Sequence, residues 1–305
     1  MWYKNLRIFR LGEAFNLTPE QLAEQLEPAS FVPCGKMELS RYGWVSPLGP
    51  EGASLAHGAG GYIALCAKKQ DKILPAGVIK EQVEEKVREI RSKESRPVGR
   101  KERENLKDEI TFSLLPQAFS KSSHCHGFID TRNRLLVVDC ASANKAEEFT
   151  SALRDALGSL KATPLNPKQP ASSVMTAWLK TGEPEGDFAL GDECELIASK
   201  DERVIRGKKL DLLDDQITQH LDTGMFASKL AVSWKETISC LIDDQFTFKR
   251  VKFSDELLER AGDRNPETMA EQFDNEFAIM TLELSAFIQA ALDAFGGEDS
   301  INEPI

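Results

Sequence analysis

The stretch NPETMAEQFDNEFAIMTLELSAFIQAALDAFGG, residues 265–297, carries the strongest secondary-structure signal in the chain. Asn265 and Pro266 are residue types preferred at a helix N-cap and first turn, and Gly296 with Gly297 is typical of a helix end. Between them, apolar residues recur every three or four positions, at Met269, Phe273, Phe277, Met280, Leu284, Phe287 and Ala291. This spacing predicts one helix, roughly 45 Å long, with one buried face.

Strand-like and helix-like segments follow one another upstream of this helix. Strands are predicted at 4–11, 62–67, 125–129, 135–140, 194–199, 203–209, 226–234, 236–242 and 246–253. Further helices are predicted after the capping box Thr18-Pro19-Glu20-Gln21 and at 76–95, 101–115, 146–157, 172–180 and 213–222. Short turns such as Asp130-Thr131-Arg132-Asn133 join successive strands. The pattern predicts an α+β fold with antiparallel sheets.

The helices at 76–95 and 101–115 are separated by Ser95-Arg96-Pro97-Val98-Gly99, a helix-breaking segment. They therefore predict a helical hairpin that projects from the sheet. Three prolines within 161–173 are typical of a linker. We expect three lobes: a central lobe of 1–75 with 120–165, a hairpin lobe of 76–119, and a C-terminal lobe of 166–305.

Composition bounds the class of protein. Of the 305 residues, 41% are hydrophobic and 29% are charged, which excludes a disordered chain. The chain has no uninterrupted run of about 18 apolar residues, so no membrane span is predicted. The N-terminus lacks the apolar region of a secretory signal. Six scattered cysteines without a C-x-x-C pair are typical of reduced thiols. We therefore expect a cytoplasmic protein.

The charge of the chain is unevenly distributed. The net charge is −11, and residues 263–305 hold ten acidic residues against one basic residue. Residues 68–107 hold thirteen Lys or Arg against eight Asp or Glu. The local electrostatic field decides where a polyanion docks. A basic surface is therefore compatible with a negative total charge of the chain. The acidic residues Glu267, Glu271 and Glu283 are expected to face away from such a surface.

Basic residues cluster at several places along the sequence. The candidate DNA contacts are Arg96, Arg100, Lys101, Arg103, Lys121, Arg206, Lys208, Lys209, Lys249 and Arg250. Each cluster by itself is more typical of a solvated surface. If the fold brings several clusters together, they form a wide positive surface that contacts phosphates and carries little sequence information.

Patterns for other chemistry are weak. His124-Cys125-His126, near Asp139 and Cys140, matches no zinc spacing, and the glycine-rich 57–61 segment precedes a strand, whereas a phosphate loop precedes a helix. The carboxylate pairs Asp214-Asp215 and Asp243-Asp244 suit a helix start and a hairpin turn. We therefore expect no catalytic site, no bound metal and no cofactor.

Several segments, taken together, resemble one family. They are Trp2-Tyr3-Lys4-Asn5-Leu6, Phe31-Val32-Pro33-Cys34-Gly35, Gly43-Trp44-Val45-Ser46-Pro47, Lys72-Ile73-Leu74-Pro75, Leu106-Lys107-Asp108-Glu109, Ser113-Leu114-Leu115-Pro116-Gln117-Ala118-Phe119-Ser120, Ile129-Asp130-Thr131, Val138-Asp139-Cys140-Ala141-Ser142-Ala143, Val204-Ile205-Arg206, Lys208-Lys209, Met280-Thr281 and Glu283-Leu284. In this order they resemble the RdgC family of recombination-associated proteins of proteobacteria over nearly the whole chain.

The resemblance implies a multi-lobed horseshoe subunit that dimerises into a closed ring with a positively lined hole. It also implies that Phe119, with Leu115 and Pro116, lies at the dimer contact and that Lys208 and its neighbours line the ring. From the residues alone, Phe119 suits either an ordinary core position or an anchor in a partner's pocket.

The function implied is sequence-independent binding of double-stranded DNA, and also of single-stranded DNA, by a nucleoid-associated homodimer that antagonises RecA-dependent recombination. No membrane partner is expected. An alternative is a protein-interaction module that binds the recombinase directly and has weak DNA affinity. A third hypothesis is a metal-dependent nuclease.

Overall fold

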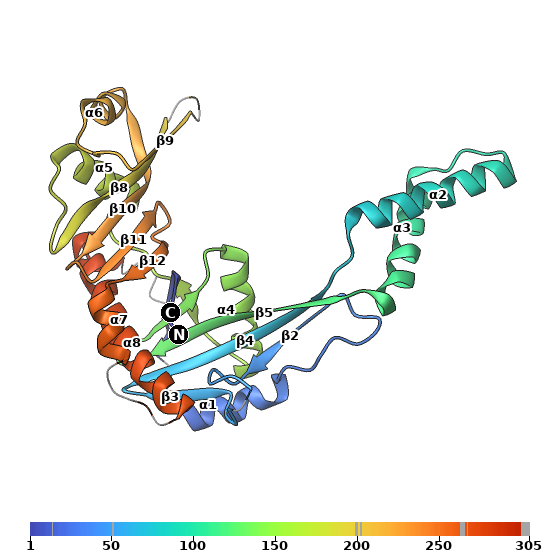
Figure 1. The fold of residues 1–305 in the computed structure, drawn as a ribbon, viewed down its shortest axis with the longest axis horizontal. Helices are drawn as coiled ribbons and strands as arrows, with labels where there is room; N and C mark the ends of the chain where they lie inside the picture. The colour runs from blue at the N-terminus through green and yellow to red at the C-terminus, as the bar shows by residue number, and fades with distance from the viewer. Residues whose placement is uncertain are drawn as a thin grey trace. The chain divides into compact units, whose positions relative to one another are not determined.

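A computed structural model describes residues 1–299 except 14, 51, 199, 200, 202, 263–265 and 267. The chain forms two compact units (Figure 1). The first unit comprises Met1–Pro28, Ser46–Cys66 and Cys125–Ile305, and the second comprises Ala29–Val45 and Ala67–His124. The chain passes between them along two long strands, β4 (Tyr62–Lys72) and β5 (Ser120–Asp130).

An antiparallel sheet is the main element of the first unit. From β5 its strands follow the order β6, β1, β12, β11, β10, β8, β9. Their bounds are β1 (Asn5–Leu11), β6 (Leu135–Asp139), β8 (Phe188–Ala198), β9 (Val204–Lys208), β10 (Met225–Trp234), β11 (Ile238–Asp243) and β12 (Phe248–Phe253). Two short strands pair at its side, β3 (Ala56–Ala59) with β4 and β7 (Ala162–Pro164) with β1.

The helices of the first unit are α1 (Pro19–Leu26), α4 (Ala143–Leu157), α5 (Ala171–Thr181), α6 (Asp215–Asp222), α7 (Asp255–Gly262) and α8 (Met269–Ala294), with a 3-10 turn, η1 (Glu27–Ala29), after α1. Side chains of Thr18, Ser142 and Asp214 cap α1, α4 and α6. Gly158 ends α4 in the left-handed conformation. These caps satisfy backbone groups that a helix end otherwise leaves unpaired.

Helix α8 supplies the centre of the main core. Phe287 lies within 6 Å of the rings of Phe188, Trp234 and Phe248, which come from three strands of the sheet. Among the described helices, α8 alone is long and apolar enough, by length and composition, to cross a membrane. Its apolar face packs in the core, where Phe277, Leu284 and Phe287 are fully buried.

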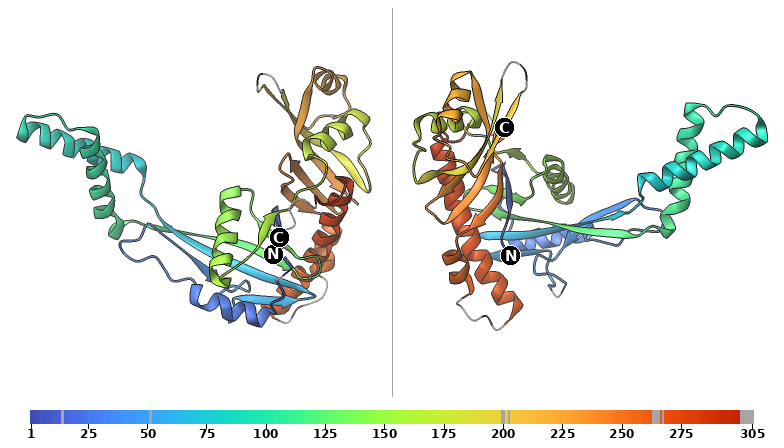
Figure 2. Two further views of the ribbon diagram at one scale, coloured as in Figure 1. Left: turned by 180° about the vertical axis from the view of Figure 1, so that it is seen from behind. Right: turned by 45° about the horizontal axis from the view of Figure 1, so that its top comes forward.

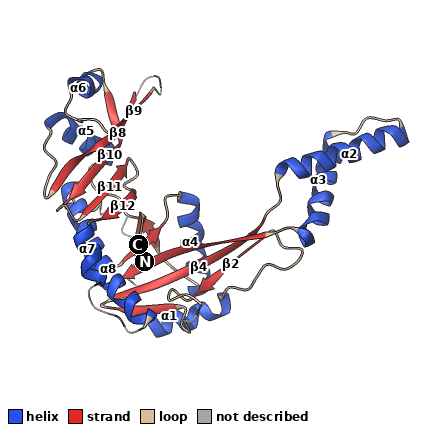
Figure 3. Ribbon diagram, viewed as in Figure 1, coloured by secondary structure: helices blue, strands red, loops and turns tan. Residues whose placement is uncertain are grey.

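The second unit carries the helical hairpin (Figures 2 and 3). Helices α2 (Ala76–Glu94) and α3 (Arg100–Leu114) are followed by η2 (Leu115–Gln117), and β2 (Ser40–Val45) adds to the strands β4 and β5. The hairpin has a small core of its own, formed by Val83, Val87, Val98 and Ile110. Ser95 ends α2 in the left-handed conformation, and the predicted helix break at Ser95–Gly99 is confirmed.

The predicted α+β class, the hairpin and the long C-terminal helix are confirmed. The predicted start of the last helix is wrong, because Thr268 is the N-cap and the helix begins at Met269. Asn265 lies outside the described residues, as does Glu267. Met269 is 77% exposed and does not belong to the buried face. The horseshoe shape and the three lobes stay predictions.

One linker prediction and one strand prediction also need correction. The 161–173 segment is not wholly a linker, because β7 pairs residues 162–164 with β1. Strand β8 begins at Phe188, six residues before the predicted start, since Phe188 and Leu190 pair with the apolar end of β10. In both cases long-range pairing forms strand structure where the local sequence lacks a strand signal.

Gly127 of β5 provides a test of the packing of α4 on the sheet. A Cβ atom at this position would lie 2.8 Å from the Phe149 ring and 3.1 Å from the Val137 carbonyl oxygen. We expect Gly127→Ala to destabilise the protein by about 1–3 kcal/mol, because the α4 contact must open. Denaturant unfolding measures this. The matched control is Gly262→Ala, where the added methyl meets open space; equal losses in both variants would contradict the packing.

Candidate nucleic-acid interface

Charged side chains cover the face of the sheet opposite α5 and α8. Arg206 and Lys208 alternate along β9, and they lie directly opposite Glu195 and Glu193 of β8. The alternate positions of β10, such as Leu230, are buried in the core. Because side chains alternate between the two faces of a strand, these charges share one face.

Glu195 is the centre of this face. Its side chain is only 10% exposed, and it lies 2.6 Å from Arg206 Nε and 2.7 Å from Lys229 Nζ. The Ser228 hydroxyl donates a further hydrogen bond of 2.9 Å. Burial by itself raises the pKa of Glu195, but the hydrogen bonds from Lys229, Arg206 and Ser228 outweigh it and lower the pKa to about 2.

Two more carboxylates hold the remaining cations of the face. Glu193 lies 3.7 Å from Lys208 Nζ and 2.9 Å from the Arg250 guanidinium. Asp243 lies 2.8 Å from Lys249 Nζ and also accepts backbone hydrogen bonds in its turn. Counting Arg206 and Lys229, five cations meet three carboxylates, so the face keeps a charge of +2.

Lys209 follows β9 directly and adds to this charge. It is exposed, its backbone has a φ of +54°, and it makes no ion pair with a described residue. We name the set Arg206, Lys208, Lys209, Lys229, Lys249 and Arg250 the basic face.

The structure thus groups five of the ten predicted DNA contacts on or beside one sheet face. Sequence reasoning missed Lys229, Glu193 and Glu195, and it assigned Asp243 to a turn only. The signal of the first three was present as alternation of charged with apolar residues in β8 and β10, which places the charges on the face away from the core.

The other predicted contacts belong to the second unit. Arg96 lies 2.6 Å from both Glu94 and Glu102, and Arg103 lies 2.6 Å from Glu84. The hydrogen bonds that Arg96 donates to Glu102 and Glu94 raise the pKa of Arg96. These pairs are exposed to solvent, which screens them, so they contribute little to stability. Arg100 lies 3.3 Å from Glu104.

Lys101 and Lys121 make no ion pair among the residues that the structure covers, and both are exposed. From Glu94 to Glu104 the hairpin tip holds four cations and three carboxylates, a net charge of +1. The positive electrostatic potential of the hairpin tip is therefore weaker than that of the basic face.

Phe119 is the most exposed large apolar side chain among the described residues, at 84%. The loop that carries it is well anchored, because its carbonyl oxygen accepts a 2.7 Å hydrogen bond from Ile73 N–H. Pro116 is also exposed, whereas Leu115 is fully buried and offers no surface to a partner. Of the two interpretations of Phe119, the core position is therefore wrong.

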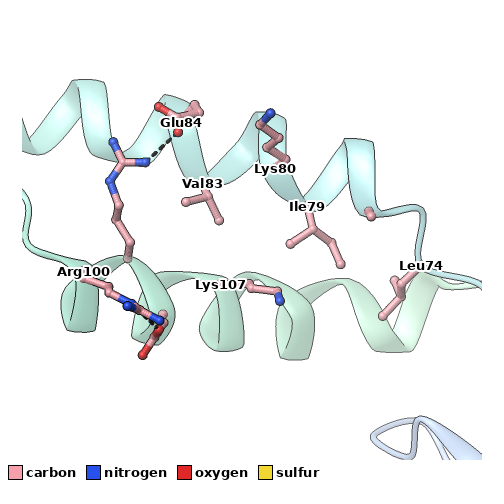
Figure 4. Close-up of a pocket in the computed structure, with 10 residues that line it drawn as sticks. Leu74, Ile79, Lys80, Val83, Glu84, Arg100 and Lys107 are labelled. Atoms are coloured by element: carbon pink, nitrogen blue, oxygen red, sulfur yellow. Dashed lines mark hydrogen bonds and ion pairs between the residues drawn. The ribbon is translucent and has the colours of Figure 1, made fainter. Parts of the chain in front are cut away.

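A groove of about 600 Å³ lies between α2 and α3 in the same unit (Figure 4). Ile79 and Val83 point from α2 toward α3 and line it, and Leu74 lies at one end. Charged side chains surround this apolar floor, namely Lys80, Glu84, Arg100, Arg103, Glu104 and Lys107.

The whole chain is similar to known proteins. A family model described as "Putative exonuclease, RdgC" matches residues 1–298. The chain belongs to the RdgC family. Relatives named recombination-associated protein RdgC are 43% identical over 300 residues in Aeromonas hydrophila, 41% over 299 in Yersinia enterocolitica and 42% over 299 in Salmonella paratyphi B. Each alignment covers 98% of this chain and 99% of the relative.

The description of the RdgC model as an exonuclease raises the question of a metal site. Within the described ranges, no group of three or more His, Cys, Asp or Glu side chains is arranged to hold a metal ion. Asp243 is engaged with Lys249 and its own turn, and Asp214 caps α6. One carboxylate of each pair that the sequence analysis singled out, Asp243 and Asp214, is therefore engaged in a structural contact.

Glu195 makes the stability of the first unit depend on pH. Its lowered pKa means that the carboxylate stabilises the folded state fully above about pH 4.5, and that this contribution, about 3 kcal/mol, is lost as pH falls toward 2. Glu195→Gln should therefore cost stability at pH 7 and much less near pH 2, as measured by denaturant unfolding. Glu185→Gln, at an exposed position, is the control. A cost that does not change between these pH values would contradict the assignment.

Proposed function

We propose that this chain binds duplex DNA without sequence preference through the basic face, and that it antagonises RecA-dependent recombination by occupying DNA. The observation that carries the proposal is the row of partly exposed cations, Arg206, Lys208 and Lys209, along the edge strand and its end. A row of cations on a sheet matches the repeating phosphates of a DNA backbone, which have the same charge in every sequence.

The three carboxylates of the basic face set the strength of this binding. Each phosphate that arrives must compete with Glu193, Glu195 or Asp243 for a cation. The face therefore gives moderate affinity that falls steeply with salt, at a log–log slope of about −0.9 per phosphate contacted. Such binding suits a protein that covers DNA broadly and competes with another DNA-covering protein.

We further propose that two subunits close into a ring around DNA. The family resemblance suggests the ring, and Phe119 with the α2–α3 groove supports one of its contacts. In a two-fold dimer the same patch serves both subunits, so Phe119 of each would enter the groove of the other. An exposed aromatic anchor and an apolar groove with a charged rim are the usual parts of a binding hot spot.

Charge reversal of Lys208 and Lys209 tests the DNA interface. Lys208→Glu with Lys209→Glu should weaken binding to unrelated duplexes alike, by about tenfold or more, and reduce the salt slope by about 2 because two phosphate contacts are lost. Fluorescence anisotropy across a salt series measures both. The control is Lys168→Glu with Lys180→Glu, which makes the same charge change at exposed positions before and within α5. Absence of binding to random duplex DNA at low salt would refute the proposal.

Removal of the Phe119 ring tests the dimer contact. Phe119→Ala should raise the dimer dissociation constant by about 30-fold, the effect of losing one hot-spot side chain. Analytical ultracentrifugation across a concentration series measures it. Phe112→Ala removes another exposed phenylalanine, 53% exposed, from α3 and should leave the constant unchanged. An unchanged dimer in the Phe119 variant would contradict this contact.

Two assays separate the rival functions. Inhibition of RecA filaments that excess DNA relieves supports competition for DNA, whereas inhibition that persists supports direct binding to the recombinase. Loss of nucleotides from linear DNA, or nicking of plasmid, with Mg²⁺ or Mn²⁺ would instead establish the nuclease that the name of the family model suggests.

A further inference from the structure

The α2–α3 groove has an apolar floor and a charged rim (Figure 4). Leu74, Ile79 and Val83 lie in the floor, and the volume of about 600 Å³ is typical of ligand pockets, which have about 300–1,000 Å³. The rim carries a net charge of +2, because four cations, Lys80, Arg100, Arg103 and Lys107, face two carboxylates, Glu84 and Glu104. The rest of the hairpin, within 76–114, holds six cations and seven carboxylates. Positive charge is therefore concentrated at the groove.

Two lysines account for this excess charge. The two rim arginines are each paired with one of the rim carboxylates, at 3.3 and 2.6 Å. Lys80 of α2 and Lys107 of α3 are exposed, and neither makes an ion pair with a described residue. The groove thus has one uncompensated ammonium group on each of its two helices, beside the apolar floor.

The loop that carries Phe119 does not match the charge of this rim. Residues 116–122 contain one cation, Lys121, and no carboxylate. In the proposed dimer the Phe119 ring of the second subunit would cover the apolar floor, but its loop would leave Lys80 and Lys107 without counter-charges and would add a like charge. A segment that carries carboxylates beside an apolar side chain would satisfy both the floor and the rim.

We propose that the α2–α3 groove binds a short acidic segment of a partner protein. An apolar side chain of that segment lies on the floor, and its carboxylates pair with Lys80 and Lys107, a combination of apolar anchor and charge-assisted contacts. Because the same floor would receive Phe119 of the second subunit, the partner displaces that ring and opens this contact of the dimer. The displacement rests on the proposed dimer, whereas the binding of the acidic segment does not.

The two occupants of the groove respond to salt in opposite ways. Interactions between exposed charges are screened as the Debye length shortens, from about 10 Å at 0.1 M salt to about 3 Å at 1 M. Binding of an acidic segment therefore weakens as salt is added, because its attraction to Lys80 and Lys107 is screened. The Phe119 contact does not weaken in this way, because its loop and the rim carry charge of the same sign.

Fluorescence anisotropy of a labelled peptide with the full chain tests the site. The peptide is poly-aspartate with one leucine and one phenylalanine at its centre. Lys80→Glu with Lys107→Glu should weaken its binding by about tenfold or more, because two attractive charges become repulsive. Lys93→Glu with Lys101→Glu is the matched control, since it makes the same change at one exposed position of each helix outside the groove.

Two further peptides separate the floor from the rim. A version with glycine in place of leucine and phenylalanine should bind about tenfold more weakly or worse, because nothing covers the floor. A version with lysine in place of aspartate should not bind. No binding of the acidic peptide, or an equal loss in both double variants, would overturn the proposal. Circular dichroism of both double variants checks that the hairpin stays folded.

Sedimentation with and without the acidic peptide tests the displacement. With peptide at about ten times its dissociation constant, the dimer dissociation constant should rise by about tenfold or more, because the peptide occupies the groove of the free subunit. A dimer that persists unchanged with peptide bound would overturn the displacement. In Phe119→Ala the groove has no competing ring, so the peptide should bind at least as tightly as to the unmodified chain. This result is expected even if the chain is monomeric, which separates a failure of the groove from a failure of the proposed ring.

Discussion

The charged face of the sheet depends on the pairing of Glu195 with Arg206 and Lys229. A carboxylate that is almost fully buried stays ionised only if cations and hydroxyl donors replace its water. In return, the carboxylate fixes both cations over the sheet, where they lose little entropy on meeting a phosphate. The same arrangement that stabilises β8, β9 and β10 therefore presents positive charge to solvent, so the proposed DNA binding would use the residues that stabilise the sheet.

The two faces of the sheet have separate roles. The face toward α5 and α8 is apolar, and the aromatic contacts of Phe287 hold the long helix against it. The acidic helix thus packs on the side away from the basic face, and Glu283 is engaged there by the Thr237 hydroxyl. This separation explains how a chain with a net charge of −11 keeps a positive surface.

Local sequence predicted the elements whose signals are local. The capping box at Thr18, the hairpin helices and the periodic core of α8 follow from spacing alone. Pairing between distant segments was not predictable, because β7 and the first part of β8 gain their structure from β1 and β10. For the same reason the cations were found as clusters but their carboxylate partners, which come from other strands, were not.

The measurement that tests the central claim most directly is the DNA affinity of Glu193→Gln. This change removes the carboxylate that holds Lys208 and Arg250 and leaves the cations in place. If the basic face binds phosphate, affinity for random duplex DNA at about 0.1 M salt should rise roughly threefold to tenfold. Glu185→Gln, with the same net charge but altered elsewhere, should leave it unchanged. Unchanged or weaker binding by Glu193→Gln would contradict the account.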